Sequence, residues 1–257
     1  MLNLDQVIKE YPENLRAFSR FAYKEYLQYK ILNIIFKSRW KQKLSFLGGT
    51  ALRICYDNQR FSEDLDFDNF GLQQEEFSQL ANDIKTNLER EGFEVETKNV
   101  FKGAYRCSIK FPKILFEYGL APHEDEKILI QIDTASHDFS YKPESFLLNK
   151  FEVFREIRLT PLDIILAQKF YAIFNRKREL GRDYFDIVFL LSKTKPNLDY
   201  LKLKLDFSSL AELKEKVLKK CETLDLSALS EDVAPFIFDK DGIARVTQFK
   251  RIITDKL

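Results

Sequence analysis

A glycine pair behind a short strand-like run is the feature that most constrains how this chain can fold. Residues 44–47 are typical of a β-strand, and Gly48 and Gly49 follow directly. Thr50 can then cap a helix over residues 51–56. Two glycines allow a sharp turn and a close approach of backbone to ligand, while a helix N-terminus presents unpaired N–H groups to an anion. The sequence therefore predicts a strand–turn–helix unit that can receive a triphosphate.

Acidic and apolar residues alternate from Asp64 to Asp68, as in a half-buried strand. Because strand side chains alternate between faces, Asp64 and Asp66 share one face while Leu65 and Phe67 point to the core. We interpret Asp68 as part of a solvated sheet face. Neighbouring carboxylates repel each other unless a cation neutralises them, and Mg²⁺ suits an all-oxygen site that also holds phosphates. Asp64 and Asp66 are therefore predicted metal ligands.

A third carboxylate, Asp133, ends the apolar part of a predicted strand over residues 127–134. If this strand lies beside that of Asp64 and Asp66, Asp133 completes a metal site or accepts the proton of an attacking hydroxyl. Each feature also has a structural explanation: a glycine pair is a common turn, paired aspartates often face solvent, and a single aspartate is often a cap. Their combination in this order favours catalysis.

Hydrophobic periodicity divides the chain near Thr160. Before it, we predict long helices over residues 14–40 and 73–90 and further strands over residues 93–100 and 105–111. After it, the pattern is helical without a convincing strand; the predicted helices cover residues 162–174, 184–191, 201–205 and 210–218. The expected fold is α/β (α+β), with a mixed sheet and flanking helices in residues 1–160 and a helical domain in residues 161–257.

Composition excludes several classes of partner and site. Lys and Arg number 41 against 40 Asp and Glu, so any nucleic-acid contact must come from a local patch. The basic run 37–43, with Trp40 for stacking, is one such patch, although a solvated helix end explains it more simply. The N-terminus has no apolar signal region and no apolar run is long enough for a bilayer, so we expect a cytoplasmic protein without a membrane partner.

Cysteine and histidine offer little to a metal site. Cys55, Cys107 and Cys221 lie far apart and form no C-x-x-C pair, which argues against a disulfide framework and a zinc site and predicts buried thiols. His123 and His137 are too few for a histidine-rich metal centre. Carboxylates remain as the main catalytic resource.

The first block of these residues resembles the AbiEii/AbiGii toxin family. These are nucleotidyltransferase-fold proteins of bacterial abortive-infection and type IV toxin–antitoxin systems, and the mycobacterial MenT toxins are relatives. The family pattern is Gly-Gly-Thr-x-Leu followed by Arg-x-Ser-x-Asp-x-Asp, and residues 48–52 and 60–66 match it throughout. The resemblance implies a nucleotidyltransferase-like sheet.

The family has a second motif, which runs Lys, then Arg, then Arg-Asp-x-x-Asp. Lys169, Arg176 and residues 182–186 of this chain are similar to it. In the family the Lys contacts nucleotide phosphate and the first Asp is needed for activity, so the resemblance gives these roles to Lys169 and Asp183. Asp186 is less clearly assigned. From the residues alone, Lys169 beside an apolar helix face favours a side chain that extends to water. Residues from Lys195 onward match no motif.

The resemblance implies a Mg²⁺-dependent transfer of a nucleoside monophosphate from a nucleoside triphosphate to an acceptor hydroxyl, with release of pyrophosphate. The acceptor would be RNA, with the 3′ end of tRNA as one candidate, and a cognate antitoxin would be the partner. The predicted catalytic residues are Asp64, Asp66, Asp133, Lys169 and Asp183; the metal ligands are Asp64, Asp66 and Asp133; the nucleotide-binding residues are Gly48, Gly49, Thr50, Ser62, Lys169, Arg176 and Arg182. Two alternatives stay open: a non-catalytic binding module, and a transferase that modifies a small molecule such as an antibiotic.

Overall fold

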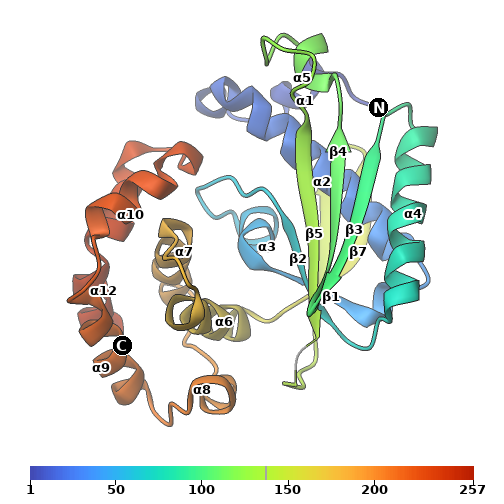
Figure 1. Ribbon diagram of the computed structural model, residues 1–257. Helices are drawn as coiled ribbons and strands as arrows, with labels where there is room; N and C mark the ends of the chain where they lie inside the picture. Colours follow the sequence, from blue (N-terminus) through green and yellow to red (C-terminus); the bar gives the residue numbers. More distant parts are fainter. Residues whose placement is uncertain (137) are drawn as a thin grey trace. The chain divides into compact units, whose positions relative to one another are not determined.

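The computed structural model describes residues 1–136 and 138–257, so His137 lies outside the described residues (Figure 1). The chain forms two compact units. Unit 1 comprises Met1–Cys55, Phe61–Asp138 and Lys142–Leu159, and unit 2 comprises Tyr56–Arg60, Phe139–Tyr141 and Thr160–Leu257. Two short segments that precede Thr160 thus pack with the C-terminal part of the chain.

A seven-stranded mixed sheet forms the centre of unit 1, in the order β3-β4-β5-β2-β1-β7-β6 (Figure 1). The β1–β7 and β2–β5 pairs are parallel and the other pairs are antiparallel. The strands are β1 Leu44–Leu47, β2 Leu65–Asn69, β3 Glu96–Lys102, β4 Ala104–Phe111, β5 Ile128–Ser136, β6 Glu144–Lys150 and β7 Val153–Leu159. The expected mixed sheet is confirmed, and β6 and β7 are additions to it.

Helices α2 and α4 cover one face of this sheet, because α2 contacts β5 and β7 while α4 contacts β3 and β4. The long helix expected from residue 14 begins as a 3₁₀ turn, Glu13–Phe18, after Pro12 and becomes α-helical only at Ser19. The helices of unit 1 are α1 Leu4–Lys9, α2 Ser19–Lys37, α3 Gly48–Tyr56, α4 Gln74–Arg90 and α5 Ile114–Glu117, with a 3₁₀ turn at Lys41–Lys43.

Strand β2 carries the predicted alternation, with one correction. Leu65 and Phe67 are buried, as expected. Asp68 is also buried, with 6% of its surface exposed, so its interpretation as a solvated residue was wrong. The reason is topological: β2 lies between β1 and β5 in the interior of the sheet, where residues have neighbouring strands on both sides.

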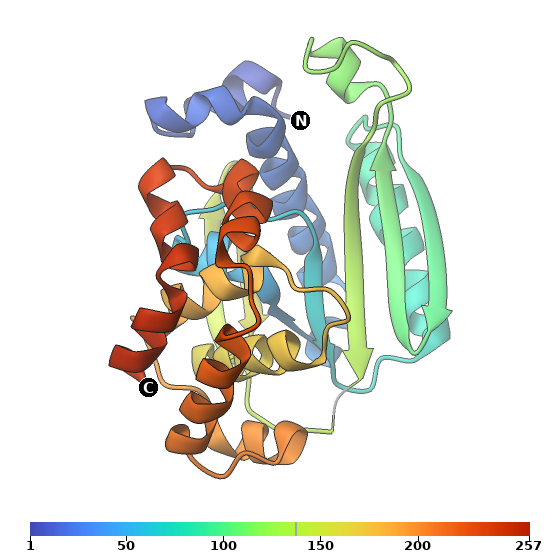
Figure 2. The same ribbon diagram turned by 60° about the vertical axis from the view of Figure 1, so that its left-hand side comes forward.

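Unit 2 is helical, and α7 is its centre. Helix α7 packs against α6, α10, α11 and α12 (Figure 2). A side chain at Gly181 would lie 1.9 Å from the carbonyl oxygen of Leu229, so this glycine lets α7 approach α10 closely. Residues 160–257 are all described and contain no strand, as expected. The helices are α6 Leu162–Asn175, α7 Gly181–Leu191, α8 Leu198–Leu205, α9 Leu210–Cys221, α10 Leu226–Val233, α11 Ala244–Thr247 and α12 Phe249–Lys256.

The sequence predicts buried thiols at the three cysteines. The cysteines are free thiols; Cys107 and Cys221 are buried and Cys55 is partly buried, and burial raises the pKa of each thiol.

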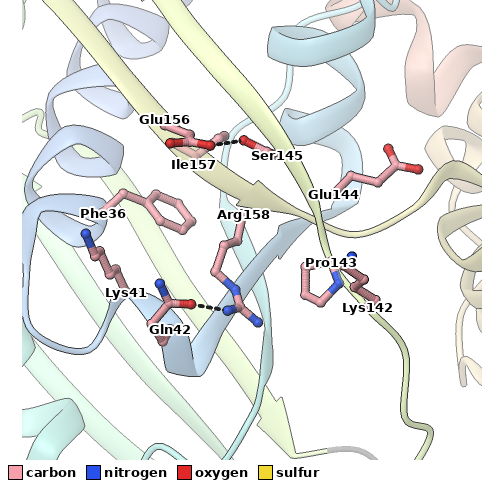
Figure 3. A pocket seen from close by; sticks show the side chains of 10 residues that line it. All are labelled: Phe36, Lys41, Gln42, Lys142, Pro143, Glu144, Ser145, Glu156, Ile157 and Arg158. Carbon is pink, nitrogen blue, oxygen red and sulfur yellow. Dashed lines mark hydrogen bonds between the residues drawn. The ribbon is translucent and has the colours of Figure 1, made fainter.

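Trp40 is only 3% exposed and lies beneath the Arg39 guanidinium, so it does not offer a free ring for stacking. Lys41 from the same basic run instead lines a pocket (Figure 3). Among the described helices, none is long and apolar enough to cross a membrane.

Candidate active site

The turn between β1 and α3 is built around Asp66. Leu47 lies opposite Asp66 in the antiparallel β1–β2 pair, and Gly48 follows with a positive φ of 81°. A Cβ atom at Gly48 would lie 2.2 Å from the Asp66 Oδ2 atom. Only glycine therefore fits here, because any side chain would collide with the carboxylate.

Helix α3 starts at Gly48, so the expectation that Thr50 caps it was wrong. Thr50 is fully buried, and its hydroxyl donates to the main-chain oxygen of Asp64. Buried Gln28 donates its side-chain amide to the main-chain oxygens of Ser62 and Glu63, at 3.0 and 2.9 Å. Thr50 and Gln28 thus fix the segment that leads into β2, and Thr50 acts here as a positioning residue.

We expect Gly48→Ala to lower the stability of the protein more than Gly92→Ala, which introduces the same kind of backbone strain. Both Gly48→Ala and Gly92→Ala place alanine at a positive φ, which costs about 1–2 kcal/mol. Only Gly48→Ala also adds a collision, because nothing lies within 4 Å of a Cβ at Gly92. Thermal unfolding should therefore show a clearly larger loss of stability for Gly48→Ala; equal losses would contradict the packing of Asp66 on this turn.

Asp64, Asp66 and Asp133 lie together on one part of the sheet. Asp66 and Asp133 are directly paired in the parallel β2–β5 ladder, and Asp64 lies directly before β2, two residues from Asp66. The Asp64 carboxylate accepts a hydrogen bond of 3.2 Å from the Gln131 backbone N–H. Burial raises the pKa of Asp64 above its ordinary value, and the negative charge of Asp133 contributes to the shift. Asp64 and Asp133 therefore interact electrostatically.

Arg106 is the cation that pairs with Asp133, and no sequence pattern singled it out. It lies opposite Asp133 in the β4–β5 ladder, and its Nε and Nη2 atoms bind the two Asp133 carboxylate oxygens at 2.6 and 3.0 Å. Asp133, followed by Asp64 and Asp66, raises the pKa of Arg106. The pairing depends on strand register, which only an alignment of β4 with β5 could have predicted.

Asp64 and Asp66 are the carboxylates of this group that could hold a magnesium ion. In the ranges 1–136 and 138–257, no group of three or more His, Cys, Asp or Glu residues is arranged to hold a metal. Mg²⁺ is commonly held by one or two carboxylates together with substrate phosphates and water. Asp64 and Asp66 match this requirement, whereas Asp133 is engaged by Arg106.

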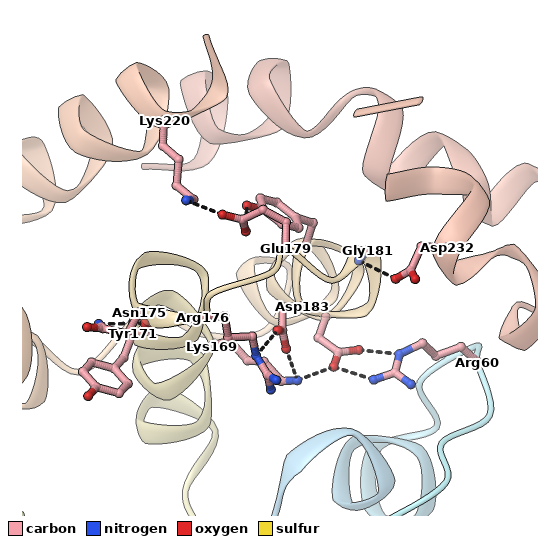
Figure 4. A network of polar contacts seen from close by, with 12 residues as sticks. Arg60, Lys169, Tyr171, Asn175, Arg176, Glu179, Gly181, Asp183, Lys220 and Asp232 are labelled. Carbon is pink, nitrogen blue, oxygen red and sulfur yellow. Dashed lines mark hydrogen bonds and ion pairs between the residues drawn. The ribbon is translucent and has the colours of Figure 1, made fainter. Parts of the chain in front are cut away.

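Unit 2 contains a separate cluster of buried charges around Lys169 (Figure 4). Its ammonium group lies 2.8 Å from the Asp183 carboxylate and 2.9 Å from the Asp186 carboxylate. Burial favours the neutral amine, but the two carboxylates outweigh it and raise the pKa of Lys169. The side chain therefore does not extend to water, which corrects the interpretation from the helix face alone.

Arg60 anchors this cluster from the other sequence block. Its Nε and Nη2 atoms lie 2.8 and 2.6 Å from the Asp186 carboxylate, which also accepts a 2.9 Å hydrogen bond from Asn58. Arg60 and Asp186 are both almost completely buried. Burial alone would raise the pKa of Asp186, but Arg60 and Lys169 lower it to about 2. The two motif blocks are thus joined by an ion pair, which gives Asp186 a structural role.

Three arginines lie at or between the end of α6 and the start of α7, and Arg176 among them pairs with this cluster. Arg176 pairs with Asp183 at 2.9 Å and its side chain is 48% exposed. Arg182 lies over the Phe236 ring, 5.2 Å from its centroid. Arg178 is 82% exposed and lies 3.4 Å from Asp232. Arg176 is therefore the cation that links the buried cluster to solvent.

The predicted site residues divide between the two units. Unit 1 contains Gly48, Gly49, Thr50, Ser62, Asp64, Asp66 and Asp133, and unit 2 contains Lys169, Arg176, Arg182 and Asp183. Within unit 1 the three aspartates come together, and within unit 2 Lys169, Arg176 and Asp183 form one network. Arg106, Arg60 and Asp186 extend these groups beyond the predicted set.

Comparisons with known proteins show the family and the fold. A family model described as "Nucleotidyl transferase AbiEii toxin, Type IV TA system" matches residues 30–251. The fold is similar to JHP933 from Helicobacter pylori (TM-score 0.58, 19% identity, 91% of this chain and 90% of that chain covered). It is also similar to MenT4, a nucleotidyltransferase toxin from Mycobacterium tuberculosis (TM-score 0.58, 16% identity, 99% and 90% covered). A search of curated proteins gave no match.

Proposed function

Because the chain belongs to the AbiEii nucleotidyl transferase toxin family of type IV toxin–antitoxin systems, we propose that it transfers a nucleoside monophosphate from a nucleoside triphosphate to RNA. Asp64 and Asp66 hold Mg²⁺ in this proposal. One observation carries it: Asp66 packs against the glycine turn at the start of α3, and the Asp64 carboxylate, two residues earlier, is bound to the Gln131 backbone of the neighbouring strand β5. The proposal therefore places the triphosphate at the start of α3, next to the metal held by Asp64 and Asp66.

In the proposed reaction, the acceptor hydroxyl attacks the α-phosphate and pyrophosphate leaves. Mg²⁺, when bound, neutralises phosphate charge and lowers the pKa of the nucleophile. The buried bond from Thr50 and the bonds from Gln28 keep Asp64 in place, so little reorganisation is needed. Asp133, on release from Arg106, would accept the hydroxyl proton.

The cluster of unit 2 supplies positive charge in this proposal. It combines three cations, Arg60, Lys169 and Arg176, with two anions, Asp183 and Asp186. One positive charge is therefore in excess, and the half-exposed Arg176 is the group that can present it to a phosphate. Lys169 contacts phosphate only if its bond to Asp183 or Asp186 is exchanged for one to the ligand.

The family supports the proposed acceptor and partner. A type IV toxin acts in the cytoplasm with a cognate antitoxin, and we propose the 3′ end of tRNA as the first acceptor to test. The experiment incubates the protein with Mg²⁺, each labelled nucleoside triphosphate in turn and total cellular RNA. Labelled RNA with stoichiometric pyrophosphate release supports the proposal. Nucleotide binding without pyrophosphate would indicate a non-catalytic module, and label on an added aminoglycoside but not on RNA would indicate a small-molecule transferase.

We expect Arg106→Gln to bind a divalent ion more tightly in the absence of nucleotide. The substitution removes a positive charge that interacts with all three carboxylates, and it releases Asp133. The dissociation constant for Mn²⁺, measured by electron paramagnetic resonance, should fall about tenfold, which corresponds to about 1.4 kcal/mol. Arg90→Gln, on exposed Arg90 at the end of α4, is the control. Equal Mn²⁺ affinity in all three proteins would contradict the competition between Arg106 and metal.

A further inference from the structure

Unit 1 contains a second candidate binding site, a pocket of about 330 Å³ that includes none of the residues discussed for catalysis (Figure 3). It is formed by the end of α2, the 3₁₀ turn before β1, the start of β6 and the end of β7. Phe36 and Ile157, both at most 2% exposed, provide its apolar wall. The volume lies at the lower end of the range for small-molecule sites, which is about 300–1,000 Å³.

Three cations line this pocket without a carboxylate partner among the residues that the structure describes. Lys41 and Lys142 are exposed and form no ion pair there. Arg158 donates one hydrogen bond, to Gln42, and its Nε atom is buried with no partner. A buried, unsatisfied guanidinium N–H is costly, so Arg158 is ready to bind an acceptor that enters the pocket.

The two carboxylates of the lining are placed so that they do not neutralise Arg158. Glu156 accepts a hydrogen bond from the Ser145 hydroxyl. Glu144 extends away from the Arg158 guanidinium (Figure 3). The part of the pocket near Gln42 and Arg158 is therefore cationic.

The surroundings favour recognition of phosphate over recognition of a base. Trp40 is buried beneath Arg39, and Phe36 is almost fully covered, so neither presents a ring face for stacking. Contacts from Lys and Arg to phosphate position a nucleic acid without reading its sequence. We propose that this pocket binds the backbone of single-stranded RNA, with Arg158 as the donor to a central phosphate and Lys41 and Lys142 each contacting a flanking phosphate.

The choice of RNA rests on the proposed function, but binding does not require nucleotide transfer, so the test uses equilibrium binding in EDTA. Fluorescence anisotropy measures binding of a 5′-fluorescein, 12-nucleotide single-stranded RNA to the full chain at several salt concentrations. Arg158→Gln should weaken binding about tenfold or more, the effect of losing a charged hydrogen bond. Lys41→Gln/Lys142→Gln should weaken it and reduce the slope of log K against log salt by about 1.4, or about 0.7 for each phosphate contact.

Lys9→Gln/Lys102→Gln is the matched control, because it removes two equally exposed lysines that lie outside the pocket. It should change affinity less than about twofold. Wild-type affinity in both pocket variants, or an equal loss in the control, would overturn the proposal. Lys41 and Lys142 are exposed, so the double lysine variant should fold. Its result therefore tests the proposal even if Arg158→Gln does not fold. Displacement of the RNA by inorganic phosphate at an equal phosphate concentration would assign the pocket to a free anion and also overturn it.

Discussion

Asp66→Asn is expected to lower nucleotide transfer by about a thousandfold or more while leaving the fold intact. Asparagine keeps the shape that packs against Gly48 but removes the negative charge that holds the metal. Charge stabilisation by a metal is worth several kcal/mol, and each 1.36 kcal/mol is a factor of ten in rate. Transfer is measured as incorporation of labelled nucleotide, and folding as circular dichroism and thermal unfolding.

Asp83→Asn is the matched control for this substitution, because Asp83 is exposed on α4, away from the carboxylate group. It should keep wild-type activity. Asp66→Asn should also unfold at the wild-type temperature or slightly above, since it removes a charge beside Asp133. Wild-type incorporation by a folded Asp66→Asn protein would refute the assignment of Asp66 as a metal ligand.

Arg60→Met is expected to lower the free energy of unfolding by about 3–5 kcal/mol, because it leaves the buried Asp186 carboxylate without its arginine partner. Arg60 and Asp186 are 1% and 0% exposed, so water cannot replace the lost bonds. Urea denaturation followed by circular dichroism measures the effect. Arg251→Met removes an exposed arginine paired with Asp255 at 4.0 Å, and it should cost at most about 1 kcal/mol.

The pH dependence of Arg60→Met provides a second readout. The pKa of Asp186 is lowered from 3.8 to about 2, so the ion pair stabilises the fold fully above about pH 4 and loses this contribution as the pH falls towards 2. The stability difference between wild type and Arg60→Met should shrink over the same interval. In Arg60→Met/Asp186→Leu the loss should be smaller than the sum of the single losses. Equal stability of Arg60→Met and Arg251→Met would contradict the role of this ion pair.

The sequence predicted those parts of the site that depend on local pattern. The alternation from Asp64 to Phe67 and the glycine turn are properties of neighbouring residues, and both are present in the structure. The apolar run before Asp133 indicated a strand, and this strand lies beside β2. Local periodicity therefore sufficed for the central strands of the sheet.

Features that depend on long-range pairing were missed. Strand β6 has only Leu148 buried, so its alternation is too weak to separate it from a loop. Arg106 became visible only through its register with Asp133, and the structural role of Asp186 only through its ion pair with Arg60, 126 residues earlier in the chain. Lys169 was misjudged for the same reason: the helix face shows its apolar neighbours, but not the carboxylates of the next helix.

The central claim is that Asp64 and Asp66 together hold the metal that binds the triphosphate. Its most direct test is a crystal structure of the protein with Mn²⁺ and a non-hydrolysable nucleoside triphosphate, with the metal located by anomalous scattering. We expect an anomalous peak about 2.0–2.3 Å from carboxylate oxygens of both residues, with triphosphate oxygens completing the coordination. A triphosphate bound elsewhere, or a metal that contacts neither aspartate, would contradict it.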